Sequence, residues 1–383
     1  MWRHVVSNFL TVTIVALFLA GSGIMLANQA YRAEGPLVAS TCVEVPRGAR
    51  FAALSSQLER DGTISSARLF RIVADYADRQ NDLKFGNYLV EAGASMEDVL
   101  EVLTDGGPST CGTEVVYTVG VTRNAARVRE LNPQTGRYEE QVRFDITEPK
   151  PAAYETAKDG AGTQFRLVVA EGTTVWGVVE AVRANDLLTG EIGEVPEEGA
   201  VAPGNYPIAP GDDRQELLAR MTAQQERILQ AAWGDRSQAG PLLSPEEALI
   251  LASIVEKETG LAEERRQVAS VFVNRLERGM RLQTDPTVIY GITEGKSVLG
   301  RGLRRSELRA GTPYNTYIIE GLPPTPIANP GRASIEAVLD PDDTPYIFFV
   351  ADGTGGHAFA VTLAEHNQNV ARWREIEAQR NNN

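Results

Sequence analysis

The chain has 383 residues, which is more than one ordinary domain needs, so we expect two or three modules. Its hydrophobic fraction of 43% and its charged fraction of 23% are typical of a globular protein. The formal net charge of −14 argues against a nucleic-acid partner, because no basic surplus is available to neutralise phosphates. The chain has 2 cysteines and 3 histidines, none in a metal-binding spacing, so we predict neither a metal nor another cofactor.

The N-terminus is a long apolar stretch. Residues 5–31 carry no charged side chain, and residues 9–27 are almost all apolar. A helix of this length exceeds the roughly 30 Å hydrocarbon core of a bilayer. Arg3 and His4 precede it, so the positive-inside rule predicts a cytoplasmic tip, a transmembrane helix over residues 1–31, and an exported remainder. A cleaved signal peptide is the alternative, although the stretch is long for one and no A-x-A site follows.

Two later segments align with each other. "KFGNYLVEAGASMEDVLEVL" at 84–103 matches "APGNYPIAPGDDRQELLARM" at 202–221 in its Gly-Asn-Tyr triplet and the helix that follows. Upstream, residues 43–58 match residues 167–182, each with an alternating strand, a glycine turn and an amphipathic helix. An internal repeat is therefore predicted. The alternative is a strand-turn-helix pattern that two unrelated segments happen to share.

The repeat divides the chain. We predict a first β-α unit at 41–104, an insertion and linker at 105–163, and a second β-α unit with a linking helix at 164–240. This layout resembles LysM-like modules, and that resemblance implies binding of N-acetylglucosamine polymers. Cys42 and Cys111 can pair outside the cytoplasm, but two cysteines alone do not establish a disulfide.

The segment "SPEEALILASIVEKETG" predicts a buried helix. Ser244 is a suitable N-cap, Glu247 completes a capping box, and Gly260 offers a C-terminal stop. The helix is apolar on most sides. Its bulkiest apolar stripe consists of Leu251, Ile254 and Val255.

Two glutamates close this helix. Glu256 and Glu258 lie about 200° apart around the axis, so they face opposite sides. Glu258 continues the bulky apolar stripe, where desolvation raises the pKa of a carboxyl, as a general acid near neutral pH requires. The alternative is that both are solvated residues at a helix end, or partners of Arg265 and Arg266.

Four motifs in the C-terminal third occur in a fixed order: "LASIVEKETG", "ERRQVASVFVNRLERGMRLQTDPTVIYGI", "TPYNTYIIEGLPPTPIANPG" and "VADGTGGHAFAVTLAEHN". Together they closely resemble the endolytic murein transglycosylases, a YceG-like family of bitopic inner-membrane enzymes that cut peptidoglycan strands. The resemblance covers residues 243–370 densely and leaves the insertion unplaced. It implies a mixed lysozyme-like/YceG-like catalytic domain at 241–383, and hence an α+β fold.

The resemblance also implies site residues. In lytic transglycosylases with lysozyme-like domains, the catalytic glutamate ends a helix and precedes Ser or Thr, which fits Glu258 and not Glu256. The substrate-binding residues that it implies are Gln283, Asp285, Tyr314, Asn315 and Asn329. For Tyr314 ordinary packing is the alternative, and for Asn329 the support of a turn.

The implied reaction needs one carboxyl. Glu258 would act first as acid and then as base, cleaving between N-acetylmuramic acid and N-acetylglucosamine and closing a 1,6-anhydro ring. The alternatives are a hydrolytic muramidase with Asp285 as second carboxylate, and a non-catalytic envelope scaffold that binds glycan. The family implies peptidoglycan strands as substrate, peptidoglycan synthases as partners, and a single-pass protein of the bacterial inner membrane with its C-terminal part in the periplasm.

Overall fold

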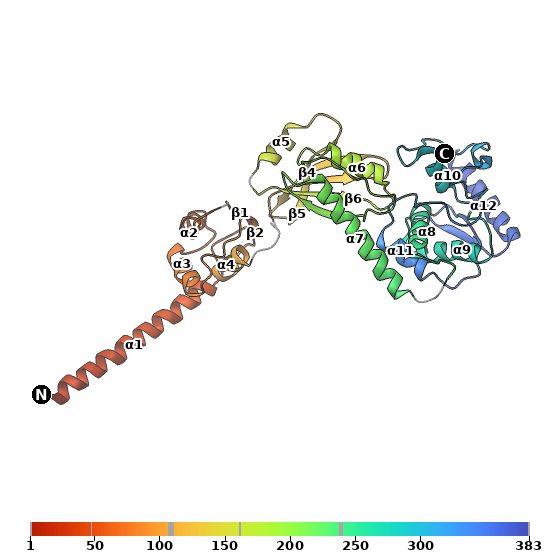
Figure 1. The fold of residues 1–383 in the computed structure, drawn as a ribbon. Helices are drawn as coiled ribbons and strands as arrows, with labels where there is room; N and C mark the ends of the chain where they lie inside the picture. The colour runs from red at the N-terminus through yellow and green to blue at the C-terminus, as the bar shows by residue number, and fades with distance from the viewer. Residues whose placement is uncertain (1, 47, 106–110, 161, 237–239, 382–383) are drawn as a thin grey trace. The chain divides into compact units, whose positions relative to one another are not determined.

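The computed structural model describes residues 2–46, 48–105, 111–160, 162–236 and 240–381. The fold is α+β with an apolar N-terminal helix, as predicted (Figure 1). The chain divides into two compact units. The first comprises residues 1–115, 127–143 and 150–164, and the second comprises 116–126, 144–149 and 165–383. The domain boundaries expected at 104, 163 and 240 stay a prediction.

The first helix is long and apolar. Helix α1 spans Trp2–Arg32, and its segment Phe9–Arg32 has 24 residues with a mean hydropathy of 2.3. By length and composition it can cross a membrane, although a signal sequence passes the same test. Its last turn is part of the first unit, because Tyr31 is buried there and Arg32 forms an ion pair with Glu97 at 3.0 Å.

Two antiparallel strands organise the first unit. Its elements are β1 (Thr41–Val45), α2 (Phe51–Arg60), α3 (Ala67–Tyr76), β2 (Gly86–Val90) and α4 (Met96–Thr104). The alternating strands bury Val43, Val45 and Tyr88 against the helices. Phe51 and Phe70 stack in this core with ring centroids 5.3 Å apart.

A disulfide joins Cys42 on β1 to Cys111, with Cα atoms 5.7 Å apart. The structure thereby answers a question that the sequence left open. The backbone N–H of Cys111 also donates to the carbonyl of Asn87 on β2 at 3.2 Å. The bridge spans a sequence separation of 69 residues, so it restricts the unfolded chain strongly.

The described part of the insertion is folded. It contains β3 (Thr113–Val119), β4 (Asn124–Asn132), β5 (Arg137–Asp145) and α5 (Ala152–Asp159). A five-stranded sheet has the order β5-β4-β3-β6-β7, so strands of the insertion continue the sheet of the second β-α unit. The end of the insertion, which was expected to be a linker, contains α5. Tyr154 and Ala157, spaced for one helix face, are both buried and hold that helix in place.

The second β-α unit comprises β6 (Gln164–Val169), α6 (Val175–Ala184), β7 (Gly204–Ile208) and α7 (Arg214–Asp235). Its hairpin has the same register as the first, since Val169 pairs with Gly204 as Val45 pairs with Gly86. The turn glycines Gly48 and Gly172 have φ values of +73° and +74°, which favour glycine. The aligned sequences thus adopt matching local geometry.

The remaining elements pack around one buried helix. They are α8 (Pro245–Glu258), α9 (Arg265–Glu277), α10 (Asp285–Thr293), α11 (Arg332–Leu339), β8 (Phe348–Ala351), β9 (His357–Ala360) and α12 (Leu363–Asn381), with short 3₁₀ turns at Ala262–Glu264 and Glu307–Arg309. Helix α8 contacts α7, α9, α10 and α11 (Figure 1). Strands β8 and β9 form an antiparallel hairpin beside α12.

Reduction of the disulfide is expected to lower the melting temperature. A bridge that closes a loop of this length typically contributes about 2–4 kcal/mol, which corresponds to roughly 5–15 °C. The measurement is thermal unfolding of the full chain in detergent with and without reductant. The Cys42→Ser/Cys111→Ser variant is the control, and it should melt at the lower temperature regardless of reductant. Equal melting of oxidised and reduced wild type would contradict the prediction.

Candidate active site

Glu258 is the last residue of α8. Ser244 caps the helix by accepting a hydrogen bond from the N–H of Glu247 at 3.3 Å, as predicted. Thr259 is already extended, with φ −138°, so the helix ends before Gly260 and needs no left-handed glycine. Glu258 itself is partly exposed, as are Glu256 and Lys257, while residues 251–255 are buried.

Burial raises the pKa of the Glu258 carboxyl, and the nearby carboxylate of Asp285 raises it further. Three groups act in the opposite direction. The hydroxyl of Thr284 donates to Oε1 of Glu258, and electrostatic interactions with His357 and Arg275 also lower the pKa. Desolvation is the largest of these effects, so the carboxyl is poised to hold a proton at a higher pH than an exposed glutamate does.

Three buried threonines hold the motif "LQTDPT" against the motif "YNTY". The N–H of Thr284 donates to Oγ1 of Thr316 at 3.1 Å, and Thr287 Oγ1 lies 2.9 Å from the same oxygen. The N–H of Gln283 donates to the carbonyl of Thr316 at 3.1 Å. The three threonines are at most 2% exposed. The cluster therefore fixes Thr284, and through it the carboxyl of Glu258.

Gln283 and Asp285 flank Thr284, and both are exposed. Gln283 has φ +49°, a left-handed backbone conformation that is strained for a side-chain-bearing residue and recurs at functional sites. Asp285 begins α10, and its Oδ1 accepts a hydrogen bond from the hydroxyl of Tyr317 at 2.7 Å. The structure thus places Asp285 near Glu258, and Gln283 immediately precedes Thr284, which contacts that glutamate.

Tyr314, Asn315 and Asn329 occupy different surroundings. The hydroxyl of Tyr314 bonds Thr325 at 2.7 Å, and its ring packs against Tyr290 with centroids 5.0 Å apart. Asn315 is 0% exposed, and its amide donates to the carbonyls of residues 307 and 310 while its oxygen accepts from the N–H of residue 317. Asn329 is also 0% exposed, and its Oδ1 accepts from the N–H of Val201 at 3.1 Å. In this geometry the three residues support loops.

Glu256 has a structural role. Its Oε2 accepts hydrogen bonds from the N–H of Gly331 at 3.0 Å and from the hydroxyl of Ser334 at 2.7 Å. These two groups lie at the N-terminus of α11, where a negative charge is favourable. The two glutamates at the end of α8 therefore have different partners, in agreement with the predicted separation of about 200°.

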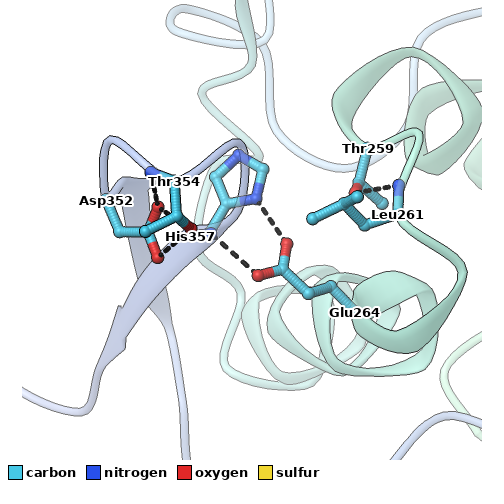
Figure 2. A network of polar contacts seen from close by, with 6 residues as sticks. All are labelled: Thr259, Leu261, Glu264, Asp352, Thr354 and His357. Carbon is cyan, nitrogen blue, oxygen red and sulfur yellow. Dashed lines mark hydrogen bonds and ion pairs between the residues drawn. The ribbon is translucent and has the colours of Figure 1, made fainter.

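Three further groups near Glu258 were missing from the predicted site, namely Tyr317, Arg275 and the pair His357–Glu264. Arg275 is 7% exposed, and its Nε donates to the carbonyl of Ile347 at 2.7 Å. His357 opens β9, and its Nδ1 lies 2.9 Å from Glu264 Oε2 while its N–H donates to Oε1 of the same carboxylate at 2.8 Å (Figure 2). Glu264 and His357 are 93 residues apart in the sequence, so no local pattern could have predicted that they form a pair.

Among the described residues, no group of three or more His, Cys, Asp or Glu side chains is placed to hold a metal ion.

Comparison with known proteins gives a consistent set of relatives. The model of the YceG-like family matches residues 43–372, a range that includes the insertion. The endolytic murein transglycosylase of Bacillus subtilis (strain 168) is 28% identical over 326 residues, covering 85% of this chain and 82% of that protein. The endolytic murein transglycosylase of Streptococcus pneumoniae serotype 2 is 28% identical over 335 residues, covering 86% of this chain but 57% of that protein. A 2.6 Å crystal structure of a yceG-like protein from Listeria monocytogenes is 24% identical, with a TM-score of 0.46, covering 86% of this chain and 98% of that chain.

Two substitutions beside Glu258 are expected to move its pKa in opposite directions. Thr284→Val removes a hydrogen bond to the carboxylate, so the pKa should rise. Asp285→Asn removes a nearby negative charge, so the pKa should fall. The measurement is carboxyl-carbon NMR of ¹³C-labelled glutamate as a function of pH, with Glu258→Gln to assign the resonance. Shifts of the same sign in both variants would contradict this account of the site.

Proposed function

This chain belongs to the YceG-like family, and on that basis we propose that it is an endolytic murein transglycosylase. The proposal is that it cleaves peptidoglycan strands between N-acetylmuramic acid and N-acetylglucosamine without consuming water, leaving 1,6-anhydromuramic acid ends. The relatives named above support the activity. The observation that carries the mechanism is the Glu258 carboxyl, whose pKa is raised by burial at the end of α8.

The proposed reaction uses Glu258 twice. The protonated carboxyl donates its proton to the glycosidic oxygen as the bond from that oxygen to C1 of the muramic acid breaks. The acetamido group of the substrate stabilises the positive charge that develops at C1. The resulting carboxylate then takes the proton of the C6 hydroxyl while O6 bonds to C1. Glu258 is protonated again at the end, so no second protein carboxylate and no water are needed.

Asp285 decides between this reaction and hydrolysis. A hydrolytic muramidase would use a second carboxylate as base or nucleophile. The carboxylate of Asp285 accepts a hydrogen bond from the hydroxyl of Tyr317 at 2.7 Å, so one of its oxygens is already engaged within the protein. This contact favours transglycosylation. We assign Gln283, Asp285 and Tyr317 to the surface that contacts the sugar rings near Glu258.

The rest of the chain suits an envelope enzyme. We propose that α1 anchors the protein in the bacterial inner membrane and that the units after it lie in the periplasm, where a disulfide is stable. The two matched β-α units are proposed to act as LysM-like glycan-binding modules, and α8 with Glu258 to serve as the equivalent of the catalytic helix of lysozyme-like transglycosylases. Peptidoglycan synthases are the proposed partners.

Glu258→Gln is expected to abolish cleavage, lowering the rate by about 10²–10⁴-fold, because the amide neither donates nor accepts the transferred proton. The measurement is mass spectrometry of fragments released from purified peptidoglycan by the full chain in detergent. Wild type should release fragments with 1,6-anhydro ends, lighter by one water than hydrolysis products. Glu256→Gln is not a suitable control, because Glu256 holds the start of α11.

Asp285→Asn separates the alternatives. It should retain anhydro products, whereas free reducing ends from wild type that disappear in Asp285→Asn would establish a hydrolase. Cleavage that persists in Glu258→Gln would remove Glu258 from the mechanism. No cleavage by wild type, together with retained binding to peptidoglycan, would favour the scaffold alternative.

The pH dependence should follow the Glu258 carboxyl. The first step needs its protonated form, so the rate is expected to fall as pH rises through the raised pKa. Thr284→Val should move this alkaline limb to higher pH and Asp285→Asn to lower pH. The measurement is kcat against pH for all three proteins. An alkaline limb that neither substitution moves would assign it to another group.

A further inference from the structure

A cavity of about 470 Å³ lies beside the candidate active site in the second unit. Its wall includes Lys257 and Pro286, the chain neighbours of Glu258 and Asp285. Consecutive Cα atoms are about 3.8 Å apart, so this wall begins next to the active-site backbone. The volume falls within the range of about 300–1,000 Å³ that is usual for ligand sites. The acid–base chemistry of Glu258 makes no use of this cavity.

The charged residues that line the cavity are all cationic. They come from the β3–β4 turn, from α8 and from the segment after α10, and they are Arg123, Lys257, Lys296 and Arg301. No lining residue in the described part of the chain is Asp or Glu, although the whole chain has 51 acidic and 37 basic residues. Glu294 and Glu307 pair with Lys296 and Arg301 at 2.5 and 2.6 Å from outside the lining. The exposed pair of Lys296 with Glu294 contributes little, so a carboxylate of a ligand can replace Glu294, whereas two hydrogen bonds hold Arg301 to Glu307.

Lys257 is held in a defined position. Its Nζ donates to the carbonyl of Gly172 at 3.2 Å, and the N–H of Gly172 donates to the carbonyl of Asn329 at 2.9 Å. On the same side, Glu198 accepts from the N–H of Val175 at 2.9 Å and from the hydroxyl of Tyr290 at 3.2 Å. These bonds join α6 and the β6–α6 turn to α8 and α10. The cation is therefore presented to the cavity at a fixed place.

The remaining wall is largely apolar. Trp176 on α6 is 44% exposed and Val298 is 60% exposed, and both line the cavity together with Ile289. A ligand that matches this wall combines small apolar groups with carboxylates. The peptide stems on the N-acetylmuramic acid units of peptidoglycan have this chemistry, because they contain alanine methyl groups and several carboxylates. A neutral sugar ring makes no use of the basic side chains in this lining.

We propose that this cavity binds the acidic peptide stem of an N-acetylmuramic acid unit beside the scissile bond. This inference rests on the proposed function, because the stem is part of that substrate. Binding of the stem would place its sugar next to Glu258, since Lys257 and Glu258 are adjacent on the helix. The enzyme would then prefer strands that carry peptides over strands from which the peptides have been removed.

The test compares two probes that differ only in the peptide. The full chain with Glu258→Gln, in detergent, is titrated by calorimetry with a disaccharide–tetrapeptide from peptidoglycan and with the peptide-free disaccharide. The peptide-bearing probe should bind with a Kd at least about tenfold lower. Adding Arg123→Glu and Lys296→Glu should remove that difference, because both side chains are exposed cations of the lining. Trp176→Ala should weaken binding of the peptide-bearing probe.

Arg374→Glu on α12 is the matched control, since it reverses an exposed charge outside the lining and should preserve the tenfold difference. Equal binding of the two probes, or a difference that survives Arg123→Glu/Lys296→Glu, would overturn the proposal. Because binding is measured without cleavage, this outcome is distinct from failure of the proposed function, which would appear as the absence of anhydro ends from wild type.

Discussion

The burial of α8 is the constraint on which the candidate site depends. Ala248, Leu251 and Ile254 are 0% exposed, and burying a side chain such as Leu or Ile contributes roughly 1.5–3 kcal/mol. A shift or rotation of the helix would therefore break its contacts with the hydrophobic core. Its last turn carries the carboxyl of Glu258 among protein atoms, at a cost in desolvation. The hydroxyl of Thr284 and the positive charge of Arg275 offset part of that cost, leaving a carboxyl with a raised pKa.

Three consecutive residues at the end of this helix point to three environments. Glu256 accepts hydrogen bonds at the N-terminus of α11, Lys257 reaches the cavity beside α6, and Glu258 contacts Thr284. Successive side chains on a helix are about 100° apart, so one fixed axis positions all three. The packing of α8 therefore fixes all three side chains together. Glu256 supports α11, Lys257 lines the cavity proposed to bind peptide stems, and Glu258 is the proposed proton donor.

The predictability of the site varied with the kind of residue. Glu258 continues an apolar helical stripe, and that periodicity favoured a desolvated carboxyl while leaving a solvated helix end as the alternative. The positions of Gln283 and Asp285 depend on a long-range contact. A hydrogen bond between Thr284 and Thr316 joins two segments that are 32 residues apart in the sequence. Asn315 and Asn329 lie in neighbouring irregular segments, where no periodicity tells which side chain faces inward. Both are buried with hydrogen bonds to backbone groups.

The sequence by itself determined the features that depend on neighbours along the chain. These include the capped helix α8, the apolar α1 and the strand–turn–helix pattern that two segments share. Tertiary structure decided the pairing of Cys42 with Cys111, the entry of the insertion into a five-stranded sheet, and the contact of Arg275 and His357 with the surroundings of Glu258. The physical reason is one of range. Periodicity and capping arise from interactions within a few residues, whereas these contacts join segments whose proximity follows from the path of the whole chain.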